Sequence, residues 1–276
     1  MAKQFIYPFT FGDKSQSDLL GGKGANIAEM VQMGLPVPPG FTITTEACRE
    51  FLSSGAVPAQ LTEQIHKSLS NLEKAVGKNF GDPSNPLLVS VRSGAKHSMP
   101  GMMETVLNVG ITPEVAEALA QSSGNQRFAW DSYRRFIDMF GRIVCDLPDE
   151  IVHKIENAFL LKANVKVVAD LPVENLKELA QQLILAIQEH TGKDFPKNPI
   201  DHLTQSIEAV FKSWNSERAR LYRRRERIPS DLGTAVNIQS MVFGNMGDTS
   251  ATGVAFTRNP STGAHELYGE YLINAQ

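Results

Sequence analysis

The spacing of hydrophobic residues predicts that the chain begins with a layer of strands and helices. Residues 41–45 alternate between apolar and polar side chains, as a short strand does. Apolar residues then recur at helical spacing from Leu61 to Val76. Residues 86–93 predict a buried strand, and residues 103–110 predict a second strand that returns from an irregular loop. This order indicates an α/β layer.

The pattern becomes helical from Pro113 onward. Four segments with a helical period follow, at residues 113–121, 126–143, 149–162 and 173–190. Residues 191–199 look like a surface connection. Residues 200–227 predict one long helix, which Pro229 ends because proline cannot continue a helix.

Strand-like patterns return near the end of the chain. Gly, Asn and Asp turns separate three expected strands at residues 233–244, 249–260 and 265–275. We expect an α+β fold in which residues 1–111 and 200–243 form a first α/β lobe. Residues 112–199 form an all-helical insertion, and residues 244–276 begin a second, incomplete lobe. A chain that stops directly after a strand is expected to be a fragment.

The charge and composition of the chain indicate which kinds of molecule it is expected to bind. The net charge is −3 and charged residues make up 21%, so no overall basic field attracts nucleic acid or anionic lipid. The start of the chain lacks a secretory pattern and no apolar run reaches membrane-spanning length, which predicts a soluble cytoplasmic protein. Cys48 and Cys145 stand alone and the histidines lack metal-ligand spacing, so we expect two reduced thiols and no metal site.

The first candidate for chemistry is Lys23, which lies in the run Gly21-Gly22-Lys23-Gly24 ahead of a predicted helix. A Walker A loop would need a serine or threonine after the lysine, and Gly24 stands there instead. A lysine flanked by glycines at a helix N-terminus can bind an anion, because backbone N–H groups come close. A solvated lysine at a helix start fits the pattern equally well.

The second candidate is Arg92, at the end of the predicted strand. A guanidinium fixed there can bind a phosphate with two hydrogen bonds, or it can cap a surface carboxylate. The small residues of the loop 94–101 would let its backbone fold over a polyphosphate, although a plain hairpin loop is the simpler interpretation. Lys23, Arg92 and this loop can converge at one sheet edge, which favours phosphate as ligand.

Two further clusters remain open to more than one interpretation. Met99, Met102 and Met103 could form a soft lid over a base or could fill the core. The arginine-rich run at residues 222–227 is best explained as the solvated end of a helix.

Four long motifs resemble one known family. They are LLGGKGANIAEM, PLLVSVRSGAKHSMPGMMETVLNVG, FAWDSYRRFIDMFG and GTAVNIQSMVFGNMGDTSATGVAFTRNPSTG, in that order. They resemble the pyruvate, phosphate dikinase family, whereas phosphoenolpyruvate synthases and rifampicin phosphotransferases look different at the loop after Arg92. The resemblance implies an ATP-grasp-type fold, in which two lobes sandwich ATP and a helical subdomain is inserted into the first lobe.

The resemblance also implies roles for individual residues. Lys23 and Arg92 would neutralise the phosphates of ATP. The loop would cover the phosphates, the strand at 239–242 would lie along the adenine, and a later turn would join the phosphate end. The residues so assigned are Gly101, Met102, Met103, Gln239, Met241, Val242 and Thr252.

The implied reaction uses ATP, pyruvate and phosphate and yields AMP, phosphoenolpyruvate and diphosphate. The β- and γ-phosphates of ATP would pass to a histidine on a separate swivelling domain, and a barrel domain would bind pyruvate. The magnesium-holding carboxylates would lie beyond residue 276, and the full-length enzyme would be a homodimer, whereas the fragment could be a monomer. Two alternatives remain, a phosphoenolpyruvate synthase-like enzyme and a nucleotide-binding or docking module without turnover.

Overall fold

The computed structural model describes residues 3–276 and contains one five-stranded antiparallel sheet in the strand order β1-β2-β7-β5-β6. The strands of this sheet are β1 (Ile6–Pro8), β2 (Gly40–Ile43), β5 (Val89–Ala95), β6 (Thr105–Val109) and β7 (Thr234–Ser240). Two short pairs lie outside it, β3 (Asn79–Phe80) with β4 (Pro86–Leu87) and β8 (Ala251–Phe256) with β9 (Tyr268–Ile273).

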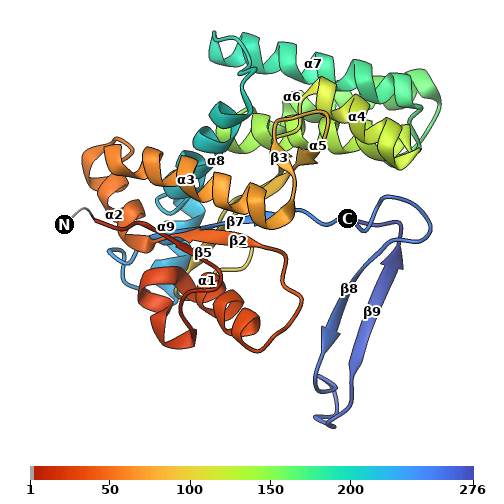
Figure 1. Ribbon diagram of the computed structural model, residues 1–276. Helices are drawn as coiled ribbons and strands as arrows, with labels where there is room; N and C mark the ends of the chain where they lie inside the picture. Colours follow the sequence, from red (N-terminus) through yellow and green to blue (C-terminus); the bar gives the residue numbers. More distant parts are fainter. Residues whose placement is uncertain (1–2) are drawn as a thin grey trace.

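Helices cover both faces of the sheet. Figure 1 shows α1 on one side and α3 and α8 on the other, with α4 to α7 grouped beyond α8. The helices are α1 (Ser17–Gln32), α2 (Thr45–Ser54), α3 (Ala59–Val76), α4 (Pro113–Ser123), α5 (Gln126–Val144), α6 (Asp149–Ala163), α7 (Val173–Thr191), α8 (Pro199–Ser213) and α9 (Glu217–Arg225). This mixture of helices and an antiparallel sheet confirms the expected α+β class.

The hydrophobic core lies on the face of the sheet that α8 covers. Phe41, Val91 and Ile238 belong to the same buried cluster as Leu203 of α8 and Phe136 of α5. Because side chains alternate along a strand, the next residues of β2, β5 and β7 point to the opposite face, toward α1. That second face is polar, and the candidate site is built on it.

Most expected elements are present, but the single helix over residues 200–227 is wrong. The structure has α8 and α9, separated by a turn at residues 214–216. The hydroxyl of Ser216 accepts a hydrogen bond from Ala219 N at 3.3 Å, which caps the new helix α9. Trp214 is buried in that turn, and its indole N–H donates to the carbonyl oxygen of Ser230 at 2.9 Å. The buried Trp214 side chain therefore anchors the turn between α8 and α9.

The interpretation of residues 222–227 as a solvated face also needs correction. Arg223 is only 3% exposed, and its guanidinium lies 4.0 Å from the centre of the Trp214 ring. It donates a hydrogen bond to the carbonyl oxygen of Trp214. Stacking of a cation on an indole face explains why one arginine of the run is buried while Arg224 and Arg225 are exposed.

The strand expected over residues 86–93 is interrupted. The structure splits it into β4 and β5, with an irregular register between Val89 and Val91. β5 then continues to Ala95, two residues further into the loop than expected. The extension matters because it places Gly94 within the sheet, beside α1.

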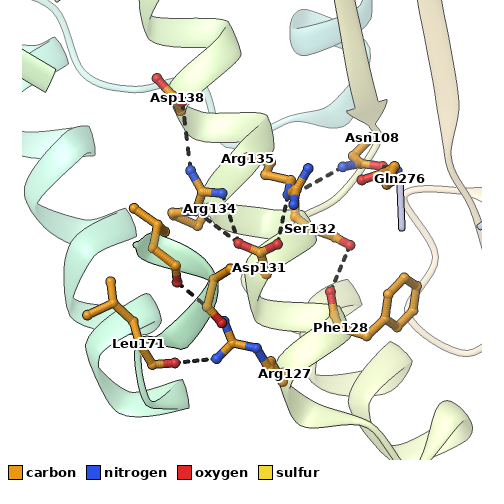
Figure 2. A network of polar contacts seen from close by, with 12 residues as sticks. Asn108, Arg127, Phe128, Asp131, Ser132, Arg134, Arg135, Asp138, Leu171 and Gln276 are labelled. Carbon is orange, nitrogen blue, oxygen red and sulfur yellow. Dashed lines mark hydrogen bonds and ion pairs between the residues drawn. The ribbon is translucent and has the colours of Figure 1, made fainter. Parts of the chain in front are cut away.

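Ion pairs between residues of α5 itself stabilise this helix, as Figure 2 shows. Asp131 Oδ1 accepts from Arg134 Nη2 at 2.8 Å, and Asp131 Oδ2 accepts from Arg135 Nε at 2.7 Å. Arg127 donates to the carbonyl oxygen of Leu171, which ties α5 to the segment before α7. α5 also packs on β6, so the helical segment shares its core with the sheet.

The β8–β9 hairpin stands apart from the rest of the chain in Figure 1, and all its strand residues are exposed. The segments on either side of it are attached. Asn125 Nδ2 donates to the carbonyl oxygen of Met246 at 2.9 Å. Gln276 Nε2 donates to Asn108 Oδ1 at 3.4 Å, a contact visible in Figure 2.

Candidate functional site

The glycine run of residues 21–24 interrupts α1 and brings it against β5. Gly21 adopts φ 68° and ψ 165°, a left-handed conformation that ends one helical segment and begins the next. A Cβ atom on Gly21 would lie 1.5 Å from the carbonyl oxygen of Gly94, and one on Gly22 would lie 2.9 Å from that of Lys96. Lys23 therefore stands in the first turn of a helical segment, as predicted.

A third glycine lets the same helix lie on the sheet. A Cβ atom on Gly24 would lie 2.9 Å from Thr42 Oγ1 and 3.0 Å from Asn237 Oδ1. Any larger residue there would push α1 off β2 and β7. These glycines let α1 pack closely on the sheet, which places Lys23 near the strands.

Polar residues form a row across four strands on the α1 face. Thr42 pairs in register with Asn237, Asn237 with Arg92, and Arg92 with Thr105. Residues directly opposite one another project to the same side of a sheet. Thr42 Oγ1 donates to Asn237 Oδ1 at 2.9 Å, whereas Asn237 Nδ2 is buried without a partner among the described residues. Arg92 therefore projects on the side where Lys23 lies.

A cavity of about 460 Å³ opens between the start of the second α1 segment and the loop after β5. Its size suits a nucleotide or part of one. It is lined by Gly22, Lys23, Asn26, Ser93, Gly94, Ala95, Lys96, His97, Ser98, Met99, Pro100, Gly101, Met103 and Thr105.

The electrostatics of this cavity favour an anion. Burial and the nearby charge of Arg92 lower the pKa of Lys23 from 10.5 to about 8. The ion pairs near the cavity join Lys96 to Asp18 and Arg218 to Glu104, and within residues 3–276 none involves Lys23 or Arg92. Two neighbouring cations without a carboxylate partner repel each other, and a bound anion would relieve that repulsion.

The methionines of the loop pack against a small hydrophobic cluster. Met99 is 8% exposed and lies in a cluster with Trp214 and Ala219. Met102 and Met103 pack on the same cluster, and of these two only Met103 also lines the cavity. They anchor the loop from residue 96 to residue 104, and Met99 and Met103 border the cavity as well.

The residues expected at the adenine lie away from this cavity. Gln239 shares its sheet face with Asn237, and its Nε2 donates to the carbonyl oxygen of Pro38 at 3.1 Å. Met241 packs against the main core, whereas Val242 is 71% exposed. None of these residues lines the cavity at Lys23.

Thr252 lies in the hairpin, where its hydroxyl donates to the carbonyl oxygen of Ala275 at 2.7 Å. The structure thus gathers Lys23, Gly101 and Met103 around one cavity, with Arg92 on the adjoining sheet face. Gly101 has φ 70°, a conformation that favours glycine, so its identity follows from the loop turn itself.

Sequence reasoning missed three polar residues of this region, Asn26, Asn237 and His97. Asn26 lines the cavity and follows Lys23 by three positions, the spacing that places two residues on one helix face. That spacing could have identified it. Asn237 interrupts an otherwise apolar strand pattern, which was its only signal. His97 had no signal beyond its place in the loop.

No group of three or more His, Cys, Asp or Glu side chains is placed to hold a metal ion within residues 3–276. Cys48 is buried and Cys145 is half-buried, and both are free thiols. Among the helices described, none combines the length and apolar character needed to cross a bilayer.

An α+β domain with two cations that lack a carboxylate partner among residues 3–276, beside a glycine-lined cavity, has the features of a domain that binds phosphate-bearing ligands. Residues 17–75 and 54–276 match the model of the family described as "Pyruvate phosphate dikinase, AMP/ATP-binding domain". The chain belongs to this family, which confirms the resemblance drawn from the four motifs.

Curated relatives agree with this family. The chain is 51% identical over its whole length to pyruvate, phosphate dikinase of Clostridium symbiosum. It is 52% identical over 96% of its length to pyruvate, phosphate dikinase 2 of Oryza sativa subsp. japonica, and 48% identical over its whole length to pyruvate, phosphate dikinase of Rhizobium meliloti (strain 1021). It spans 32%, 30% and 31% of these relatives, or about a third of their length.

Proposed function

We propose that this chain binds ATP through the cavity between α1 and the loop 96–104, as the nucleotide-binding part of a pyruvate, phosphate dikinase. One observation carries the proposal. Lys23 and Arg92 lie close enough for the charge of Arg92 to lower the pKa of Lys23, and neither has a carboxylate partner in the described chain. A phosphate chain between them would supply the missing counter-charge.

The glycines support phosphate as the ligand. Gly22 and Gly94 line the cavity, so backbone atoms form its wall where side chains would otherwise fill it. We assign Gly101, Met102 and Met103 to the cover over the phosphates. We assign Gln239, Met241 and Val242 to the adenine and Thr252 to the phosphate end, by resemblance to the family.

The architecture we propose is ATP-grasp. The sheet with α1 forms the wall of one lobe from residues 1–111 and 200–243. The hairpin within 244–276 begins the facing lobe, and its strand residues are all exposed. Residues 112–199 form the helical insertion.

In this role the chain contributes electrostatics and positioning. Phosphoryl transfer needs little covalent chemistry from side chains, because charge neutralisation and alignment account for most of the rate. Lys23 and Arg92 would hold the phosphates. Magnesium bound with the nucleotide would neutralise further phosphate charge.

For the whole protein we propose the dikinase reaction, with ATP, pyruvate and phosphate giving AMP, phosphoenolpyruvate and diphosphate. A histidine on a swivelling domain would receive the β- and γ-phosphates, a barrel domain would bind pyruvate, and the enzyme would act as a cytoplasmic homodimer. Some relatives are named as chloroplastic, so location can differ within the family.

The proposal predicts that Arg92→Ala and Lys23→Ala each lower the affinity of the 276-residue chain for ATP at least about tenfold. Each removes a charge-assisted phosphate contact of roughly 1.5–3 kcal/mol. Isothermal titration calorimetry with ATP measures this. Arg224→Ala is the control, because Arg224 is an exposed arginine outside the cavity. Equal affinities for the wild type and both cavity variants would refute the site.

A further inference from the structure

A third cation borders the same cavity but is held by an acidic side chain. Lys96 lines the cavity, and its Nζ lies 2.5 Å from Asp18 Oδ1. Asp18 belongs to the first segment of α1, before the break at Gly21, whereas Lys96 follows the last residue of β5. The pair therefore joins the helix on one side of the cavity to the loop on the other.

The pair between Lys96 and Asp18 is exposed enough for a ligand to replace Asp18 as the partner of Lys96. The side chain of Asp18 is 73% exposed and that of Lys96 is 35% exposed, and exposed pairs contribute little to stability. Lys23 and Arg92 have no such partner in the described chain. Within residues 3–276, Lys96 is the one of these three cations that has a carboxylate partner.

The main chain at Lys96 is fixed, so only its side chain needs to move. Its carbonyl oxygen lies so close to α1 that a Cβ atom on Gly22 would be 2.9 Å away. Met99, three residues later, is buried against Trp214 and Ala219. A rotamer change of the lysine can therefore carry its ammonium group from Asp18 to a ligand without moving the loop.

We infer that Lys96 leaves Asp18 and binds the polyphosphate tail of the nucleotide, so that Asp18 serves as an internal counter-ion that the ligand displaces. This inference rests on the proposed ATP site. It makes Lys96 a specificity residue, because a tail of several phosphates reaches a third cation that a monophosphate leaves with Asp18. No covalent step is involved.

Two substitutions test the exchange by calorimetry with ATP and with AMP. Lys96→Met should weaken ATP binding about tenfold, since one charge-assisted contact is lost, and should change AMP binding less than about twofold. Asp18→Asn should strengthen ATP binding by about threefold, because no carboxylate then competes for Lys96. The double variant should bind ATP within about twofold of Lys96→Met, because the competition needs both residues.

Matched controls come from the same helix region. Lys14 and Glu29 form an exposed pair at 3.5 Å and neither lines the cavity. Lys14→Met and Glu29→Gln change the net charge equally and should leave ATP binding within about twofold.

The outcomes separate the two proposals. If Arg92→Ala weakens ATP binding while Lys96→Met and Asp18→Asn only match their controls, the exchange is refuted and the ATP site stands. If ATP and AMP bind alike and Arg92→Ala changes nothing, the site and the exchange both fail.

Discussion

The fold disfavours the charged form of the Lys23 side chain. Burial first and Arg92 second lower its pKa from 10.5 to about 8, so it is mostly charged at neutral pH but loses its proton readily above that. A polyphosphate bound beside it would favour the charged form and raise the pKa again. Ligand binding and protonation of Lys23 are therefore linked.

From this linkage we predict proton uptake on ATP binding at about pH 8.5. Because the charged lysine is the form that binds phosphate, the affinity should fall as the pH rises through the free-state pKa of about 8. Calorimetry in buffers of different protonation enthalpy measures the uptake. Lys23→Met should abolish it, and an unchanged uptake in that variant would rule Lys23 out as its source.

At the residue scale, the sequence showed where Lys23 lies but not what surrounds it. The glycines around Lys23 predicted a helix start at this position, because glycine interrupts a helical pattern. The register that sets Arg92 opposite Asn237 comes from pairing between β5 and β7, which lie far apart in the chain. Long-range pairing of this kind leaves no local pattern, so the polar row could not be predicted.

At the scale of elements, α5 contains a nearly buried ion pair that stabilises the helix. The side chains of Arg134 and Asp131 are 8% and 13% exposed. Burial alone would raise the pKa of Asp131, but Arg134 and Arg135 lower it below its usual 3.8. The paired carboxylate therefore stabilises the fold above about pH 4, and this contribution is lost as the pH falls through the lowered pKa.

Asp131→Asn should accordingly reduce the free energy of unfolding by roughly 1.5–3 kcal/mol at pH 7, because the buried guanidinium of Arg134 loses its charge-assisted hydrogen bonds and keeps only its longer pairs with Asp138 at 3.8 Å and Glu156 at 3.7 Å. Urea denaturation followed by circular dichroism measures the change. Glu178→Gln breaks the exposed pair with Lys162 and should cost under about 1 kcal/mol. Similar losses in the two variants would show that α5 does not depend on this pair.

The helices and strands themselves were mostly predictable, because amphipathic spacing survives in the sequence whatever the tertiary contacts. The break between α8 and α9 was not. Ser216 can cap a helix or lie within one, and the burial of Trp214 and Arg223 decides between these possibilities only in the folded chain. Tertiary packing overrode a continuous helical pattern at that point.

At the scale of the whole molecule, the β8–β9 hairpin is the part with least packing, since its strand residues are all exposed. We predict that trypsin cuts first at Arg258, the one Lys or Arg within residues 244–276. Lys193 and Lys197 lie in a connection that His202 and Phe195 help to anchor. Mass spectrometry of the first fragments identifies the first cleavage site. A first cut at Lys193 or Lys197 would contradict the prediction.

The division into lobes stays a prediction, because α5 packs on β6 and shares its core with the sheet. The placement of the phosphates is the more central claim. It is tested most directly by a crystal structure of the 276-residue chain with a non-hydrolysable ATP analogue. The phosphate oxygens should lie within hydrogen-bonding distance of Lys23 Nζ and the Arg92 guanidinium, beneath the loop 96–104. Phosphates bound at the arginines of α9, with Lys23 and Arg92 free of ligand, would contradict the proposed function.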